Sequence, residues 1–170
     1  QSIAELVTNY GCTVVLCTAT QPALNDFFPE TLKPAEIMES PSELYNCFKR
    51  VKVTLKGSYD DEELSNELLD HNQVLCIVNT RKHAQVLFSK LSEYGLAFHL
   101  STYMCPVHRL EIIKKIKYYL DNNLQCRVVA TPLIEAGVDL DFPVVYRAVA
   151  GLDSIIQAAG RCNRNGKLEV

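Results

Sequence analysis

The second half of the chain alternates between short, largely apolar runs and longer segments in which apolar residues repeat with helical spacing. The runs occupy residues 74–78, 97–100, 127–131 and 144–149. Between them, apolar side chains recur three and four positions apart, as in Ala84, Leu87, Phe88 and Leu91. Continuous apolar runs are typical of parallel strands that are buried on both faces. The alternation therefore predicts an α/β fold with a parallel sheet, flanking helices and right-handed crossovers.

Residues with capping preferences mark where these helices begin and end. Asn79 or Thr80 can cap the helix that follows the first run, and Gly95 is suited to ending it. Pro106 fits the first turn of the next helix. Asp153 can cap a last helix that runs through residue 159.

The first seventy or so residues follow a less regular pattern. Residues 13–17 have the composition of a buried strand, and four prolines then punctuate a loop-rich stretch between residues 22 and 41. Alternation over residues 51–56 predicts a half-exposed strand, and Asp60 with Glu63 gives a capping-box signature for a helix. Because the strand at 13–17 has few obvious partners, we expect it to pair with an edge of the sheet or with a neighbouring molecule.

Ligands of open parallel sheets bind at the carboxyl ends of the strands. Small residues follow each predicted strand, and we expect four of them to share one edge of the sheet: Thr80, Ser101, Thr131 and Gly151. Small polar residues also cap helices, so a purely structural role is the alternative at any single position.

Composition indicates a soluble globular protein. The 170 residues are 48% hydrophobic and 22% charged, which excludes a disordered or collagen-like chain. No apolar run approaches the roughly 18 residues of a membrane span, and no basic and apolar leader is present, so we expect no membrane partner. The first residue is Gln1, which we interpret as the start of a piece of a longer protein.

Seven cysteines are scattered along the chain without a C-x-x-C pair. Several lie inside apolar runs, where a free thiol packs as a small apolar residue. We infer a reducing, cytoplasmic setting. We expect no metal site, because Cys105 and His108 have no second close pair to complete four ligands.

The net charge of −3 conceals an uneven distribution. Residues 1–72 carry 5 basic and 12 acidic side chains, whereas residues 73–170 carry 12 basic and 8 acidic ones. The basic excess of the second part is compatible with a nucleic-acid groove, and two differently solvated surfaces are the alternative.

Two stretches combine residues that suit phosphate. Residues 130–139 read ATPLIEAGVD, and residues 157–166 read QAAGRCNRNG. In the second stretch, Arg161 and Arg164 lie among glycines. A guanidinium donates paired hydrogen bonds to phosphate oxygens, and glycine lets a backbone approach closely. The alternative is a surface loop with two solvated arginines.

These stretches resemble motifs of the superfamily 2 helicases. Thr18, Ala19 and Thr20 are similar to motif III, residues 130–139 to motif V, and residues 157–164 to the Q-x-x-G-R-x-x-R signature of motif VI. Finer resemblance is to the helicase-nuclease of type I CRISPR systems. It lies in TATQPAL at residues 18–24, YMCPVHR at 103–109 and QAAGRCNR at 157–164.

The resemblance implies a RecA-like fold, a parallel sheet flanked by helices that forms the second lobe of a helicase. It divides the chain into three parts. Residues 1–28 would be the C-terminal remnant of a first RecA-like lobe, residues 29–48 a linker, and residues 49–170 the second lobe.

The resemblance also implies roles for single residues. Arg161 and Arg164 would be catalytic, stabilising charge on the γ-phosphate of ATP. The nucleotide-binding residues would be Gly137, Asp139, Gln157 and Gly160. Single-stranded DNA would contact Thr80, Arg81, Arg109 and Thr131. Thr18, Ala19 and Thr20 would couple the nucleotide state to strand movement.

Other parts of such an enzyme are absent from these 170 residues. The sequence has no G-x-x-x-x-G-K-[ST] phosphate loop and no His-Asp doublet for a nuclease metal site. We therefore expect ATP and Mg²⁺ to bind mainly to a first lobe, no cofactor to bind tightly to this chain, and the chain alone to lack ATPase and nuclease activity. The two arginines should lie exposed and side by side, without a strong structural acid partner.

The implied partners are single-stranded DNA, a first RecA-like lobe and an HD nuclease domain of the same protein, and a CRISPR surveillance complex. Two alternatives stay open: another superfamily 2 DNA or RNA helicase lobe, and a nucleic-acid-binding α/β module without catalysis. A dinucleotide-binding enzyme should show G-x-G-x-x-G after its first strand, and this chain does not.

Overall fold

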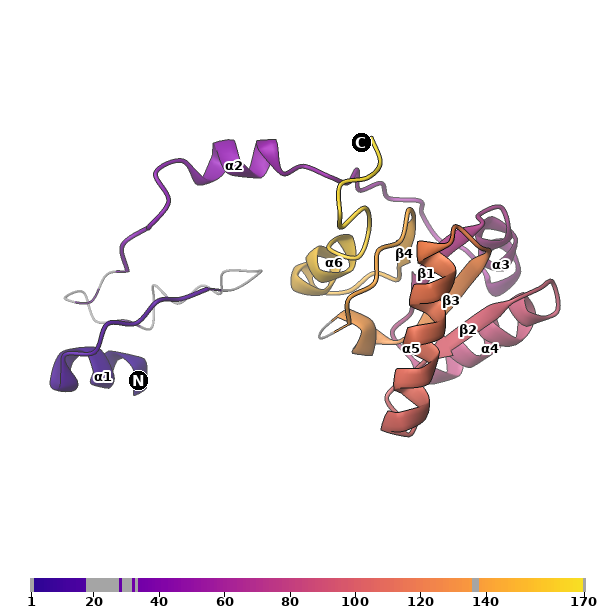
Figure 1. Ribbon diagram of the computed structural model, residues 1–170, viewed down its shortest axis with the longest axis horizontal. Coiled ribbons are helices and arrows are strands. Elements are labelled where there is room, and N and C mark those ends of the chain that lie inside the picture. The colour runs from indigo at the N-terminus through magenta and orange to yellow at the C-terminus, as the bar shows by residue number, and fades with distance from the viewer. Residues whose placement is uncertain (1, 18–27, 29–31, 33, 136–137, 170) are drawn as a thin grey trace. The chain divides into compact units, whose positions relative to one another are not determined.

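The computed structural model describes residues 2–17, 28, 32, 34–135 and 138–169. The chain divides into two compact units, Gln1–Lys49 and Arg50–Val170. Two helices lie in the first unit, α1 (Ser2–Tyr10) and α2 (Pro41–Cys47), and neither of them contains a buried residue (Figure 1). Helix α2, which begins at a proline, lies in a stretch that the sequence predicts to be a loop. The division of residues 1–48 into a lobe remnant and a linker stays a prediction.

The prediction of a strand at residues 13–17 is wrong. These residues have no regular secondary structure, and Val15 is 66% exposed. A strand needs a partner for its backbone hydrogen bonds, and the described residues of the first unit contain no other strand. The expected pairing with an edge of the sheet is also not found, because the sheet consists of the four strands of the second unit.

The second unit contains all the strands and the remaining helices. In chain order they are α3 (Asp61–Leu69), β1 (Gln73–Ile77), α4 (Arg81–Ser92), β2 (Ala97–Leu100), α5 (Pro106–Asp121), β3 (Cys126–Ala130), the 3-10 helix η2 (Pro132–Glu135), β4 (Val145–Arg147) and α6 (Leu152–Ala159). The four strands form one parallel sheet in the order β2-β3-β1-β4. The predicted α/β class with a parallel sheet is thus confirmed.

Helices cover both faces of this sheet and bury two apolar clusters. Successive residues of β1 point to opposite faces: Val74 and Cys76 pack with Leu68 of α3 and with α4, whereas Leu75 and Ile77 pack with α5, η2 and α6. This alternation follows from the period of two in a strand, and it explains why both faces of β1 had to be apolar. The unit therefore has three layers, helices on sheet on helices (Figure 1).

Most of the predicted helix starts are confirmed. Asp60 accepts hydrogen bonds from the N–H groups of Glu62 and Glu63, and the Glu63 carboxylate accepts from the Asp60 N–H, so a capping box begins α3. Thr80 caps α4. The last helix begins differently from the prediction, with Gly151 at the N-cap and Asp153 inside the first turn.

The strand predicted at residues 51–56 is also wrong. These residues have no regular structure, and Val53 and Leu55 are 65% and 91% exposed. The alternating pattern identifies a possible strand but supplies no partner for it.

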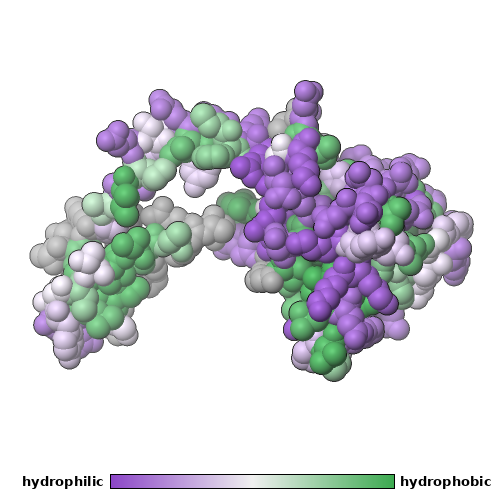
Figure 2. All heavy atoms as spheres, viewed as in Figure 1, coloured by the Kyte–Doolittle hydropathy of each residue, from purple (hydrophilic) through white to green (hydrophobic). Residues whose placement is uncertain are grey.

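Among the described residues, no helix is both long enough and apolar enough to cross a membrane. Hydrophilic side chains cover much of the visible face of the second unit, including the C-terminal segment (Figure 2).

Candidate functional site

The carboxyl ends of all four strands meet at one edge of the sheet, as the sequence predicts. Thr80 follows β1, Ser101 follows β2, Thr131 follows β3 and Gly151 follows β4. An open groove lies at this edge, and three of the four predicted nucleic-acid contacts line it: Thr80, Arg81 and Thr131. The rest of its lining is Asn79, Lys82, Thr102, Pro132 and Leu133.

The two threonines of this groove have different surroundings. The Thr80 hydroxyl accepts a hydrogen bond from the backbone N–H of His83 at 3.2 Å, so it acts as a helix cap. Thr131 is only 4% exposed, and its hydroxyl has no hydrogen-bond partner within the described part of the chain. A buried polar group without a partner costs about 1–3 kcal/mol. Thr131 is therefore the polar group of the groove with the most to gain from a ligand.

Arg81 stacks on an aromatic ring at the border of the groove. Its guanidinium carbon lies 3.5 Å from the ring centroid of Tyr103, and Tyr103 is 81% exposed. The attraction between a cation and an aromatic face holds such a pair together. Arg81 and Lys82 give the groove two positive charges beside its hydroxyl groups, a combination that suits the phosphate backbone of a nucleic acid.

The fourth predicted contact, Arg109, lies apart from this lining. It is half-buried in the first turn of α5, and it is not among the residues that line the groove. The structure thus brings together three of the four residues.

The segment that follows α6 is fixed against the chain that leads to β4. The Phe142 N–H donates to the Arg161 carbonyl at 2.9 Å, and the Asn163 N–H donates to the Phe142 carbonyl at 2.9 Å. These bonds form a short parallel bridge between Phe142 and Cys162. The bridge holds the backbone of residues 161–163 against Phe142, which comes three residues after the end of the stretch at residues 130–139.

Asn163 anchors this segment, and sequence reasoning missed it. Its side-chain amide donates to the carbonyls of Arg50 at 2.9 Å and Leu168 at 2.8 Å, and its Oδ1 accepts from the Leu168 N–H at 3.0 Å. Asn163 has φ 44°, a left-handed conformation that asparagine tolerates better than most residues. The signal available in the sequence was an amide residue directly between the two arginine positions of a glycine-flanked loop.

Arg161 is buried, which contradicts the expectation that both arginines are exposed. It is 8% exposed, and its Nε donates to the carbonyl of Ile134 in η2 at 3.1 Å. Burial lowers the pKa of Arg161, the nearby charge of Arg164 adds to this, and the Asp139 carboxylate opposes it. The physical reason for the burial is that α6 ends at residue 159, and the chain then turns toward η2, where a carbonyl receives the guanidinium.

Arg164 has an acid partner, but it is not a strong structural partner of the kind that we expected to be absent. Its Nε lies 3.1 Å from Oδ1 of Asp139, and the two side chains are 43% and 75% exposed. An ion pair with this exposure contributes about 0–1 kcal/mol to stability. The pair joins a residue of the first phosphate-type stretch to a residue of the second.

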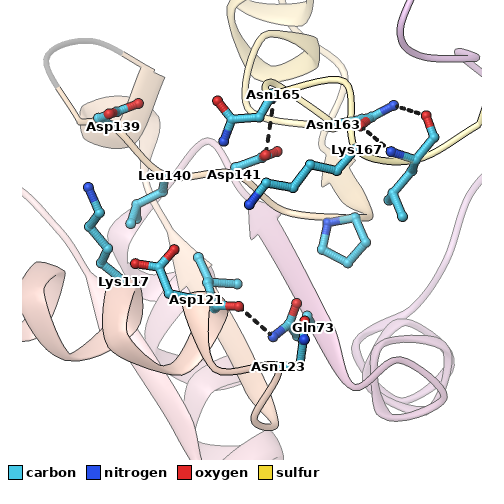
Figure 3. Close-up of a pocket in the computed structure, with 13 residues that line it drawn as sticks. Gln73, Lys117, Asp121, Asn123, Asp139, Leu140, Asp141, Asn163, Asn165 and Lys167 are labelled. Atoms are coloured by element: carbon cyan, nitrogen blue, oxygen red, sulfur yellow. Dashed lines mark hydrogen bonds between the residues drawn. The ribbon is translucent and has the colours of Figure 1, made fainter.

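A second pocket, of about 290 Å³, lies at the opposite edge of the sheet. Gln73 at the start of β1 lines it, together with Asp139, Asp141 and residues after Arg161 (Figure 3). Asp141 points toward Asn165 and accepts its backbone N–H at 3.2 Å, and it also accepts the Arg164 N–H at 2.7 Å. The charged residues of the lining are Lys117, Asp121, Asp139, Asp141 and Lys167. Because the lining carries two lysines and three aspartates, this pocket is not suited to bind an anion without further positive groups.

Two further predicted nucleotide contacts lie in or beside α6. Gln157 is half-buried in the helix, and Gly160 forms its C-cap. A Cβ at Gly160 would lie 3.3 Å from the Gln157 carbonyl oxygen, which is closer than an ordinary contact. The remaining predicted residues, Gly137, Thr18, Ala19 and Thr20, lie outside the residues that the structure describes.

The described residues contain no group of three or more His, Cys, Asp or Glu side chains that could hold a metal ion. The buried thiols of Cys76 and Cys126 pack in the apolar core. Burial raises the pKa of Cys76 to about 12, and that of Cys126 also to about 12.

Residues 70–167 match the family model for the C-terminal region of the CRISPR-associated nuclease/helicase Cas3. The chain belongs to this family. The match covers the whole sheet, the groove and the Arg164–Asp139 pair.

Curated members of the family include the Cas3 nuclease/helicase of Methanothermobacter thermautotrophicus. It is 30% identical to this chain over 176 residues, which is 95% of this chain and 21% of the relative. The Cas3 nuclease/helicase of Haloferax volcanii is 60% identical over 38 residues, 22% of this chain and 4% of the relative. The chain thus spans at most about a fifth of the length of these relatives.

Solved structures of Cas3 from T. fusca share the fold of about two thirds of this chain. One is 23% identical with a TM-score of 0.55, and covers 65% of this chain and 15% of that chain. Another, described as Cas3-ATP, is 25% identical with a TM-score of 0.55, and covers 65% of this chain and 14% of that chain. The predicted RecA-like fold of a helicase lobe is thereby confirmed.

Proposed function

We propose that this chain is the C-terminal helicase region of an ATP-dependent translocase that moves along single-stranded DNA in CRISPR interference. The observation that carries the proposal is the meeting of Arg164 with Asp139 in a member of the Cas3 family. These residues lie in two separate phosphate-type stretches, and the fold places Nε of one 3.1 Å from Oδ1 of the other.

The role of the two arginines follows from their surroundings. Arg164 is partly exposed, and its weak ion pair can exchange Asp139 for a phosphate oxygen at little cost, since exposed pairs contribute about 0–1 kcal/mol. Arg161 is held by the Ile134 carbonyl and keeps a second positive charge beside Arg164. Such charges stabilise the phosphoryl group as it is transferred. Arg164 is therefore proposed as the catalytic contact, and Arg161 as the charge beside it.

ATP and Mg²⁺ are proposed to be held mainly by a first RecA-like lobe. Asp139, Gln157 and Gly160 would border the nucleotide when the lobes close. The family resemblance implies that Gly137 also contacts the nucleotide. The pocket beside Asp139 carries both positive and negative charges, so we expect this chain to bind an anion weakly on its own. This supports the proposal that the first lobe holds most of the nucleotide.

The groove at the carboxyl edge is proposed to hold the DNA backbone. Thr80, Arg81 and Thr131 offer hydroxyl and guanidinium groups, which contact phosphates without reading the sequence. Arg109 would contact the strand beyond the groove. Thr18, Ala19 and Thr20 would couple this movement to the nucleotide from the side of the first lobe.

The proposed partners are single-stranded DNA, the first RecA-like lobe and HD nuclease domain of the same protein, and a CRISPR surveillance complex. The two relatives are each named as a nuclease/helicase, so both activities are attributed to one protein, and this chain matches only a part of it. The chain alone is accordingly expected to hydrolyse neither ATP nor DNA.

The test is Arg164→Ala in the complete protein that contains this chain. We expect DNA-stimulated ATP hydrolysis to fall by roughly 10³ or more while ATP still binds, because the lost charge acts on the transferring phosphate. ATP turnover and nucleotide binding are measured side by side. Lys115→Ala is the matched control, since it removes an exposed positive charge of α5 and should leave turnover unchanged.

Near-normal turnover in the Arg164→Ala protein would contradict the proposed role. If single-stranded DNA still bound in that case, the chain would act as a nucleic-acid-binding module without a catalytic arginine. If RNA stimulated hydrolysis and DNA did not, the assignment to DNA would be wrong, and this member of the family would act on RNA.

A further inference from the structure

Tyr103 is an aromatic residue that the proposed function leaves without a role. It lies between β2 and α5, and at 81% it is among the most exposed of the large hydrophobic side chains. Exposure of a large ring costs hydrophobic stabilisation. A ring kept at a groove with phosphate-type contacts points to a ligand that offers an apolar face.

The position of the ring relative to the groove is set by two neighbours. Arg81, whose guanidinium carbon lies 3.5 Å from the ring centroid, lines the groove, and so does Thr102, the preceding residue. An aromatic ring has two faces, and Arg81 covers one of them. Because the side chain stays 81% exposed, the other face is open to solvent.

A separate observation points to a ligand in the same groove. The hydroxyl of Thr131 is buried in the groove lining without a hydrogen-bond partner in the described part of the chain. Thr131 and the Arg81–Tyr103 pair belong to different strands, loops and helices, so neither feature is a consequence of the other.

We propose that Tyr103 is a stacking platform for one base of the bound single strand. The base lies on the open face of the ring, while Arg81 covers the opposite face and directs its remaining N–H groups to a phosphate. This inference rests on the proposed function. It adds a contact to a DNA base, whereas the other proposed contacts are to the DNA backbone. Stacking accepts any base, because every base has a π-face, so it suits an enzyme that moves along unrelated sequences.

The test measures the affinity of the full chain for a labelled oligothymidylate and for an abasic strand of the same length. Tyr103→Ala should weaken binding of oligothymidylate about 5- to 150-fold, the loss expected for one stacked base. The abasic strand should bind the variant and the unaltered chain equally. Tyr103→Phe should bind oligothymidylate like the unaltered chain, because phenylalanine keeps the ring.

Two control variants separate stacking from other effects. Tyr94→Ala removes a 68% exposed tyrosine from the turn between α4 and β2, at the opposite edge of the sheet, and should change neither affinity. Arg81→Ala should weaken binding of both strands and reduce the dependence of affinity on salt by about one counterion. Equal melting temperatures confirm that each variant is folded, which the exposure of Tyr103 leads us to expect.

Other results of these binding measurements would contradict either the stacking platform or the DNA groove. If Arg81→Ala weakens binding and Tyr103→Ala does not, the stacking platform is wrong and the proposed DNA groove stands. If Tyr103→Ala weakens the abasic strand equally, the ring only holds Arg81, and the platform is again wrong. If the unaltered chain binds neither strand, both the groove and the platform fail.

Discussion

Arg161 and Arg164 lie three positions apart but depend on the fold in different ways. Arg161 is buried and hydrogen-bonded to a carbonyl of η2, whereas Arg164 is partly exposed and pairs with an exposed carboxylate. Asn163, between them, has its whole amide occupied by backbone groups of Arg50 and Leu168. The residue that the structure needs most in this segment is therefore the asparagine, although the arginines carry the family resemblance.

This difference predicts two unlike effects on stability. Arg164→Ala should change the free energy of unfolding by no more than about 1 kcal/mol, because an exposed ion pair contributes little. Asn163→Ala should cost about 1–3 kcal/mol, because it removes three hydrogen bonds of a buried amide and places alanine at φ 44°. Urea denaturation of the chain measures both.

Asn165→Ala is the matched control for Asn163→Ala. Asn165 contributes its backbone N–H to Asp141, and alanine keeps that group. An Arg164→Ala variant as unstable as Asn163→Ala would mean that Arg164 has a structural role, and that the exchange of Asp139 for phosphate is wrong.

At the scale of single elements, the Asp60 cap of helix α3 makes a contribution to stability that depends on pH. The backbone N–H groups of Glu63 and Glu62 donate to the Asp60 carboxylate and lower its pKa below the ordinary 3.8. A carboxyl whose pKa is lower in the folded state stabilises the fold above its unfolded pKa. That contribution is lost as the pH falls through the folded pKa.

Asp60→Ala should therefore lower the melting temperature at neutral pH, because it removes the cap. The gap between the variant and the unaltered chain should shrink as the pH falls below about 4. Melting curves over a pH series check this. Glu62→Ala, which removes a neighbouring carboxylate but keeps the N–H that binds Asp60, should show a smaller gap. A gap that stays constant down to strongly acidic pH would rule out the charged cap.

The same scale shows what sequence pattern can and cannot predict. The strands of the sheet and the cap of α3 are predicted correctly because their signals lie within a few residues of one another. The strands at 13–17 and 51–56 are predicted wrongly because a strand also needs a partner, and a local pattern does not say whether one is present. The common edge of Thr80 and Thr131 follows from parallel topology alone.

The surroundings of the candidate site residues could not be predicted in this way. The burial of Arg161 depends on a carbonyl 27 positions earlier in the chain. The ring contact of Arg81 depends on how the loop after β2 places Tyr103. Both are tertiary contacts between segments that carry no shared pattern.

At the scale of the whole molecule, the buried core belongs to one of the two units. Both apolar clusters are formed by residues between 64 and 158, all within Arg50–Val170. Helices α1 and α2 of the other unit contribute no buried residue. The second unit thus has what a domain needs to fold alone.

We predict that residues 50–170, expressed alone, melt cooperatively within about 5 °C of the full chain, a shift of roughly 1 kcal/mol. Residues 52–170 should melt lower, because Arg50 bonds Asn163 through its carbonyl and Arg164 through its guanidinium. Thermal denaturation followed by circular dichroism compares the three chains. Non-cooperative melting of residues 50–170 would show that the first unit is required for folding.

The order of the strands also has a mechanical consequence. Strands β1 and β3 are paired residue for residue, from Gln73 with Cys126 to Ile77 with Ala130, and they run from the edge beside Asp139 to the edge that holds the groove. Five residues of strand span about 17 Å, so a tilt of about 10° at one end displaces the other by roughly 3 Å. If the nucleotide acts beside Arg164 and the DNA lies at Thr131, as we propose, a small rotation of the sheet at one end would displace the DNA contact at the other by this distance.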